Sequence, residues 1–123
     1  MKDLKISKEL LGSVMEFKKQ NVYSKDLDFI RLNENNIQFA FKTEHNIQNV
    51  FSINIYEFAF KGKEWLIKNN FSYTVYYDDY FKNFRCTILS IIGYEKRETF
   101  TANTEIEAII KACEWILENK DNK

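Results

Sequence analysis

The stretch of sequence that decides the fold lies near the end of the chain, where Thr104–Asn119 has the sequence TEIEAIIKACEWILEN. An earlier stretch, Asn54–Asn69, has the sequence NIYEFAFKGKEWLIKN and matches it at a constant offset of fifty positions. Each stretch begins with a capping residue that glutamate follows three positions later, which is the capping-box pattern of a helix N-terminus. We therefore predict two amphipathic helices on the same sheet face, with Trp65 and Trp115 largely buried at related positions.

The residues before each predicted helix have the composition of strands. Apolar and polar residues alternate there, and β-branched and aromatic side chains are frequent. The pattern predicts three strands in each of two units, 26–69 and 71–119, at 26–32, 37–42 and 47–53 and at 71–77, 84–92 and 94–101. A further helix is expected from Ser7 to about Lys18.

The predicted fold class is α+β, with an N-terminal helix followed by two βββα units and an antiparallel sheet covered by helices. The matching helices have two explanations: an internal duplication, or convergence of two amphipathic helices, which the almost complete lack of identity between the strands favours slightly. The 123 residues are 45% hydrophobic and contain no proline or linker, so a single domain, 1–123, is expected.

The charge and the N-terminal sequence narrow the classes of partner. Eighteen basic and eighteen acidic residues leave no net charge, so there is no global field to hold nucleic acid or an anionic membrane. The N-terminus has no uninterrupted apolar run, which predicts a cytoplasmic protein without a membrane partner. The sequence neither requires nor excludes association of the chain into a homodimer.

Catalytic and metal sites are not indicated by the sequence. The chain has one histidine, His45, in an expected turn, and its two cysteines, Cys86 and Cys113, lack a CxxC spacing. The three glycines are too far apart for a phosphate loop, and Gly62 in mid-helix instead predicts a close approach of another backbone. We expect no enzyme activity, cofactor or metal, and we expect both thiols to be reduced and buried.

Half of the residues from Phe71 to Phe84 are aromatic, and this hairpin is the candidate binding site. Turn residues alone would close a hairpin, so aromatic residues at its tip need another explanation. Residues of these types are enriched in protein-binding hot spots, which predicts a partner-binding edge made of Tyr76, Tyr80, Phe81 and Arg85. Two alternatives are a sheet whose aromatic residues are covered by helices on both faces, and stacking on single-stranded nucleic acid. The latter requires Lys82, Arg85, Lys96 and Arg97 to share a face with Tyr76 and Tyr80.

The segments 53–65 and 104–116 resemble those of small phage and prophage proteins of AT-rich bacteria, such as the phage α/β/α-sandwich domains. The matching residues occupy cap and core positions, so the resemblance carries over no functional site. It implies a non-enzymatic protein that binds a host protein in the host cytoplasm, with inhibition of host defence as one such role. The alternatives are a nucleic-acid-binding accessory module and a protein that sequesters a small ligand, which would need a concave polar pocket.

Overall fold

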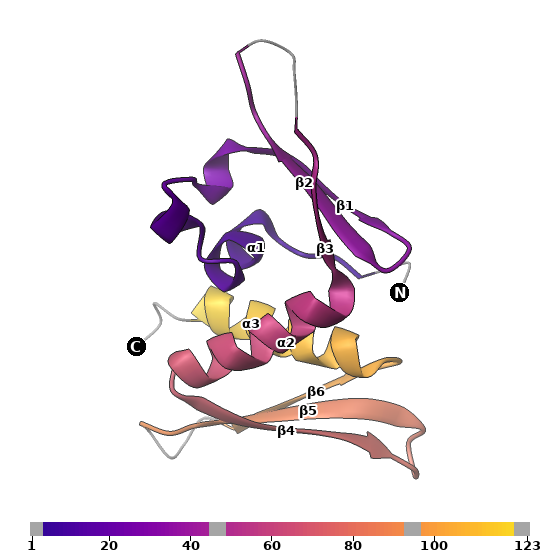
Figure 1. The fold of residues 1–123 in the computed structure, drawn as a ribbon. Coiled ribbons are helices and arrows are strands. Elements are labelled where there is room, and N and C mark those ends of the chain that lie inside the picture. Colours follow the sequence, from indigo (N-terminus) through magenta and orange to yellow (C-terminus); the bar gives the residue numbers. More distant parts are fainter. Residues whose placement is uncertain (1–3, 45–48, 93–96, 120–123) are drawn as a thin grey trace.

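The computed structural model describes residues 4–44, 49–92 and 97–119. Helices and strands follow the predicted order (Figure 1). They are α1 (Lys8–Val14), the 3-10 turns η1 (Phe17–Gln20) and η2 (Ser24–Asp26), β1 (Leu27–Asn33), β2 (Asn36–Phe41), β3 (Phe51–Asn54), α2 (Ile55–Lys68), β4 (Phe71–Asp78), β5 (Asn83–Ser90), β6 (Arg97–Ala102) and α3 (Glu105–Asn119).

The strands form two three-stranded antiparallel sheets, which confirms the α+β class. The first sheet has the order β1-β2-β3 and the second sheet the order β4-β5-β6. The helices lie between the two sheets, with α1 on the side of the first sheet and α2 and α3 against one face of the second (Figure 1). The strands are thus divided between two sheets because the helical layer separates them.

The second sheet and its two helices enclose the larger part of the core. Helix α2 lies over β4, and α3 lies over β5 and β6. Cys86 and Ile88 of β5 are fully buried beneath the helices. The predicted apolar stripe of α2 is confirmed, since all of its members are buried: Ile55, Phe58, Ala59, Gly62 and Leu66. Burial of the larger of these side chains, Ile55, Phe58 and Leu66, stabilises the fold by roughly 1.5–3 kcal/mol each.

Helix α1 packs its apolar side against η1, η2 and the helices α2 and α3, and it is shorter than predicted. Leu10, Leu11 and Val14 are buried, as is Phe17, whose ring contacts the ring of Phe39 in β2. The helix ends at Val14 because the backbone of Glu16 takes left-handed angles (φ 56°, ψ 50°), which an α-helix cannot contain. The expected end near Lys18 was therefore wrong, although the apolar spacing identified the buried side chains.

The ends of α2 and α3 are built in the same way. Asn54 Oδ1 accepts a hydrogen bond from the Tyr56 backbone N–H at 2.8 Å, and Thr104 Oγ1 accepts one from the Glu107 N–H at 3.2 Å. At the other ends, Asn69 Nδ2 donates to the carbonyl of Trp65 and Asn119 Nδ2 to that of Trp115, both at 2.8 Å. Each capping residue thus satisfies backbone groups that a helix end leaves free. These shared capping roles account for the matching residues at the two ends of each helix.

The two tryptophans differ in their burial. Trp65 is 8% exposed, in agreement with the prediction. Trp115 is only partly buried, and its ring lies 6.0 Å from that of Phe100 in β6. The matching positions on neighbouring helices therefore have different surroundings: Trp65 lies beside residues of α1 and η1, whereas Trp115 lies beside Phe100.

The neighbours of Gly62 are side chains of α3, chiefly Cys113, and not the backbone that was predicted to approach it. The Cys113 thiol lies 3.7 Å from the Gly62 carbonyl oxygen and donates a hydrogen bond to it. Cys86 and Cys113 are both free and buried, as predicted. A helix interior normally disfavours glycine, and the position that a Cβ would take here lies 3.4 Å from the Cys113 sulfur.

Some side chains expected in the core are exposed, and some of the residues named in the predictions are not among those that the structure describes. Tyr77 shares the inner face of β4 as expected, yet it is exposed at the end of the sheet, where its ring packs edge-on against Phe84 at 5.0 Å. Phe51 of β3 is also exposed, although it stacks on Phe39. The positions predicted for His45, Asn46, Ile47, Gly93, Tyr94 and Lys96 lie outside the described residues.

Candidate functional site

The tip of the β4–β5 hairpin is held by the side chain that precedes it. The two strands pair in register up to Asp78 and Asn83. Asp78 Oδ1 accepts hydrogen bonds from the backbone N–H groups of both Tyr80 and Phe81, each at 2.9 Å. Aspartate commonly fixes turns in this way, because its short side chain reaches the backbone two and three residues on. The tip is therefore a defined turn.

Two aromatic rings project from this turn. Tyr80 is 85% exposed and Phe81 is 58% exposed. Their rings meet edge to face with centroids 4.8 Å apart. The Arg85 guanidinium lies over the Phe81 ring at 4.6 Å and also forms an ion pair with Asp78 at 3.5 Å. Arg85 thus braces the tip from the neighbouring strand through a cation–π contact and a charge contact.

Tyr76 joins this group from the outer face of the second sheet, which is the face turned away from α2 and α3. Because Cys86 and Ile88 point to the helices, their neighbours Arg85 and Thr87 point to the outer face. Tyr76 is the register partner of Arg85 and is 42% exposed. The structure therefore brings together all four residues predicted as a binding site: Tyr76, Tyr80, Phe81 and Arg85.

The cations required for nucleic-acid binding are only partly assembled. Arg97 pairs with Leu89 and so shares the outer face with Arg85. Lys82 lies in the tip, where its backbone is left-handed (φ 55°), and Lys96 is outside the described residues. The charge of Arg85 is offset by its ion pair with Asp78. The outer face therefore offers a weak positive field.

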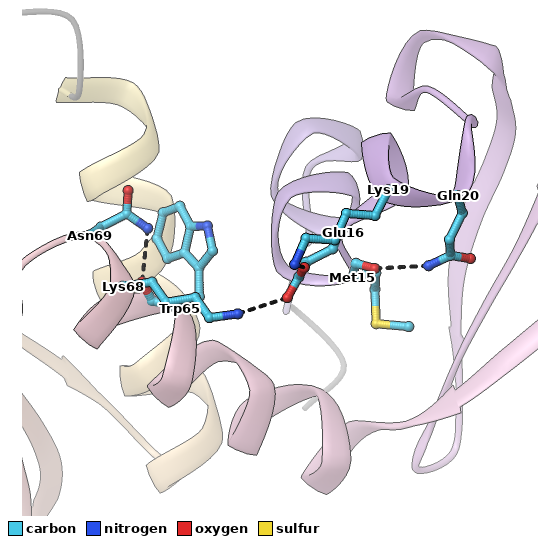
Figure 2. A network of polar contacts seen from close by, with 7 residues as sticks. All are labelled: Met15, Glu16, Lys19, Gln20, Trp65, Lys68 and Asn69. Atoms are coloured by element: carbon cyan, nitrogen blue, oxygen red, sulfur yellow. Dashed lines mark hydrogen bonds and ion pairs between the residues drawn. The ribbon is translucent and has the colours of Figure 1, made fainter.

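A second candidate site, which the sequence did not indicate, is a cleft between η1 and α2. Its volume is about 710 Å³, within the range of small-molecule sites. Figure 2 shows Trp65 and Lys68 on the α2 side facing Glu16 and Lys19 on the other side. The lining residues are Gly12, Ser13, Val14, Glu16, Phe17, Lys18, Lys19, Val22, Tyr23, Ser24, Lys61, Glu64, Trp65, Lys68 and Asn69.

Ion pairs hold the mouth of this cleft. The Glu16 carboxylate contacts Lys19 and, across the cleft, Lys68 at 2.8 Å (Figure 2). The hydrogen bonds from Lys19 and Lys68 lower the pKa of Glu16 from 4.5 to about 2, and Glu16 in turn raises the pKa of Lys68. The carboxylate therefore stays charged at all physiological pH values and links the segment after α1 to α2.

No sequence signal revealed the cleft because it depends on two left-handed residues. Glu16 and Asn21 at either end of η1 both have positive φ. Asparagine takes this conformation readily, but glutamate does so rarely and at some cost. The run of lysines between them has the composition of a solvated helix end. Only the folded backbone shows that these lysines line the same cleft as Trp65.

Metal-ligating side chains do not cluster within residues 4–44, 49–92 and 97–119. Of the helices in that part of the chain, none is long and apolar enough to span a bilayer. No protein-family model matches the chain, and no curated protein and no solved structure matches it either.

Proposed function

We propose that this protein is a non-enzymatic binding protein that docks on another protein through the β4–β5 hairpin tip. The observation that carries the proposal is the exposure of Tyr80 and Phe81 on a turn that Asp78 and Arg85 hold in place. Exposed aromatic residues cost solubility, and a fixed backbone reduces the entropy lost on binding. Aromatic and arginine side chains are also those that dominate binding energy in protein interfaces.

The resemblance to small phage proteins suggests the class of partner. On that basis the partner is a host protein in the cytoplasm, and inhibition of host defence is one role of that kind. The zero net charge supports a protein partner over nucleic acid, whose binding depends on released counterions.

Alanine substitutions at the tip test the proposal. Tyr80→Ala and Phe81→Ala should each weaken binding to the partner by about 1–4 kcal/mol, the range of interface hot spots, while the thermal midpoint stays nearly unchanged. A photo-crosslinking amino acid at position 80 would first capture the partner from host lysate. Titration of the purified partner by calorimetry would then give the affinities.

Tyr23→Ala is the matched control, because Tyr23 is another exposed tyrosine and directly precedes η2, which belongs to the part of the chain across the helices from the second sheet (Figure 1). It should leave the affinity unchanged. Equal losses for Tyr23→Ala and Tyr80→Ala would refute a site at the tip. Capture of oligonucleotides instead of protein, with an affinity that falls steeply with salt, would favour the nucleic-acid alternative.

Small-ligand sequestration is a second candidate function, supported by the cleft. Four lysines and two glutamates line it beside Trp65, so an anionic ligand is the class that fits its charge: Lys18, Lys19, Lys61 and Lys68 against Glu16 and Glu64. Ligand binding there should change the Trp65 fluorescence in a Trp115→Phe background. Unchanged fluorescence across a panel of nucleotides and organic phosphates would argue against this function.

A further inference from the structure

The edge strands of the two sheets differ in how they are protected. Natural proteins protect edges with charges, bulges, short strands or covering groups, because an open edge can pair with another chain. In the first sheet, β1 has a bulge between Leu27 and Phe29, and β3 has only four residues. In the second sheet, β6 begins with charged residues, and Lys111 Nζ donates to the carbonyl of Thr101 at 2.8 Å.

Strand β4, the other edge of the second sheet, has none of these protections. Its first seven residues, FSYTVYY, contain no charge and no proline, and all eight of its residues pair with β5 without a bulge. Strands of this length and composition favour pairing with a further strand. Within the described residues, no strand pairs with the outer edge of β4.

The backbone groups that β4 turns outward can be identified from its pairing with β5. The Ile91 N–H donates to the Asn70 carbonyl at 2.8 Å, so these two residues form a hydrogen-bonded pair one step before β4. Hydrogen-bonded pairs alternate in an antiparallel ladder, and therefore the even-numbered residues of β4 bond to β5. The N–H and C=O groups of its odd-numbered residues face away from the sheet: Phe71, Tyr73, Val75 and Tyr77.

These four residues are arranged so that the strand can pair with itself. If two copies of β4 run antiparallel with Thr74 opposite Thr74, Phe71 lies opposite Tyr77 and Tyr73 opposite Val75 of the second copy. In this register every outward N–H and C=O group of the four residues forms a hydrogen bond with the other copy. A register shifted along the strand in either direction would leave some of these groups without a partner. Aromatic residues meet aromatic or β-branched ones, and such cross-strand pairs are favourable.

The charges at the ends of the paired segment also fit a second copy. In this register Asn70 lies opposite Asp78, so an amide meets a carboxylate and no like charges face each other. The whole chain carries no net charge, so two copies do not repel at long range.

Helix α2 extends the same surface. Tyr56, Phe60 and Ile67 share one helical face and are each more than half exposed. The buried stripe of α2 has a flank on each side. Lys61 and Lys68 lie on the flank that lines the cleft. The three exposed apolar residues lie on the opposite flank. Because α2 lies over β4, this flank is at the β4 edge (Figure 1).

We infer that this protein forms a two-fold symmetric homodimer in which β4 of each copy pairs antiparallel about Thr74, giving a continuous six-stranded sheet. A symmetric interface requires a self-complementary surface, which the β4 register supplies. The interface is one strand and one helix flank wide, smaller than that of an obligate dimer, so we expect an equilibrium in the micromolar range. The dimer leaves the hairpin tips free, and the inference is independent of the function proposed above.

Substitution of two threonines in one cross-strand row tests the inference. Thr74 and Thr99 flank Thr87 on opposite edges of the second sheet, and both are exposed. In Thr74→Lys two lysines would face each other at the symmetry axis, which should weaken association by about tenfold or more. Thr99→Lys should associate like the wild type. Sedimentation equilibrium across the micromolar range measures the dissociation constant of each variant. An equimolar mixture of Thr74→Lys and Thr74→Glu should form the dimer again, because opposite charges then face each other at the axis.

A cross-link checks the register. Facing residues of a non-hydrogen-bonded pair have Cα atoms about 4.5 Å apart, which suits a disulfide. Thr74→Cys should therefore form a covalent dimer under mild oxidation far faster than Thr99→Cys, since Cys86 and Cys113 are buried. A wild-type protein that stays monomeric across this range would overturn the inference. So would a dimer that Thr74→Lys leaves intact, or one that only Thr99→Lys disrupts.

Discussion

Glu114 of α3 accepts two hydrogen bonds from Ser7, from its hydroxyl at 2.6 Å and from its backbone N–H at 3.1 Å. The same hydroxyl accepts the Leu10 N–H at 3.0 Å and so caps α1. One serine therefore both begins the first helix and joins it to the last. Glu64 occupies the matching position of α2 but is exposed, so the contact is particular to α3.

Ser7→Ala should lower the free energy of unfolding by about 1–3 kcal/mol, because it removes a helix cap and a hydrogen bond to a carboxylate. Urea denaturation followed by circular dichroism measures the change. Ser52→Ala is the control, since Ser52 is exposed in β3, and it should change stability by less than about 0.5 kcal/mol. Equal changes in the free energy of unfolding for the two variants would contradict the role of Ser7 as a helix cap and as a link to Glu114.

Glu114 should make the protein more stable as the pH falls from neutrality. Burial raises the pKa of Glu114 above 4.5, although the hydrogen bonds from Ser7 act in the opposite direction. A raised folded-state pKa means that the folded protein binds the proton more readily than the unfolded chain, so stability rises as the pH falls through that pKa. Glu114→Gln should remove this rise, which denaturation at several pH values between 7 and 4.5 would show.

Glu16 should affect the pH dependence of stability in the opposite direction to Glu114. Its pKa is lowered to about 2, so its contribution to stability is complete above pH 4.5 and is lost as the pH falls toward 2. Glu16→Gln should therefore flatten the acid side of the profile and leave the region above pH 4.5 parallel to the wild type. A parallel profile below pH 4.5 would show that the ion pairs with Lys19 and Lys68 do not persist in solution.

Alanine should have opposite effects at the two helical glycines. A Cβ at Gly62 would lie 3.4 Å from Cys113 Sγ, an ordinary contact, so Gly62→Ala should gain up to about 1 kcal/mol from helix propensity. A Cβ at Gly12 would overlap Ser24 Oγ and crowd the Phe17 ring, so Gly12→Ala should lose stability. Thermal midpoints of the two variants decide the matter, and a loss at Gly62 would mean that α2 and α3 cannot separate slightly to admit a methyl group.

Both thiols should react slowly in the folded protein. Burial raises the pKa of Cys86 to about 11 and raises that of Cys113 further, so little thiolate forms at mildly alkaline pH. Ellman's reagent should consequently modify both cysteines quickly in denaturant and neither quickly without it. Fast reaction of the native protein at either position would contradict the buried placement.

The sequence predicted those parts of the fold that depend on local periodicity and caps. The stripe of α2, the order of strands and the capping roles of Asn54 and Thr104 follow from residues within one element. The aromatic tip was also identified from the sequence, because Tyr80 and Phe81 exceed what a turn requires, and its exposure is what the structure adds. What could not be predicted depends on distant segments or rare backbone angles, such as the left-handed Glu16 or the cleft that it helps to form with Lys68.

Asn54 has a mechanical consequence, since it is both the last residue of β3 and the cap of α2. Its backbone pairs with Asn36, and the N–H of Ile55 donates to the Asn35 carbonyl at 2.7 Å. The β1–β2 turn is thus fastened to the first turn of α2 with no hinge residue between them. A displacement of the first sheet should therefore move α2 with it, and the two should reorient together as one rigid unit.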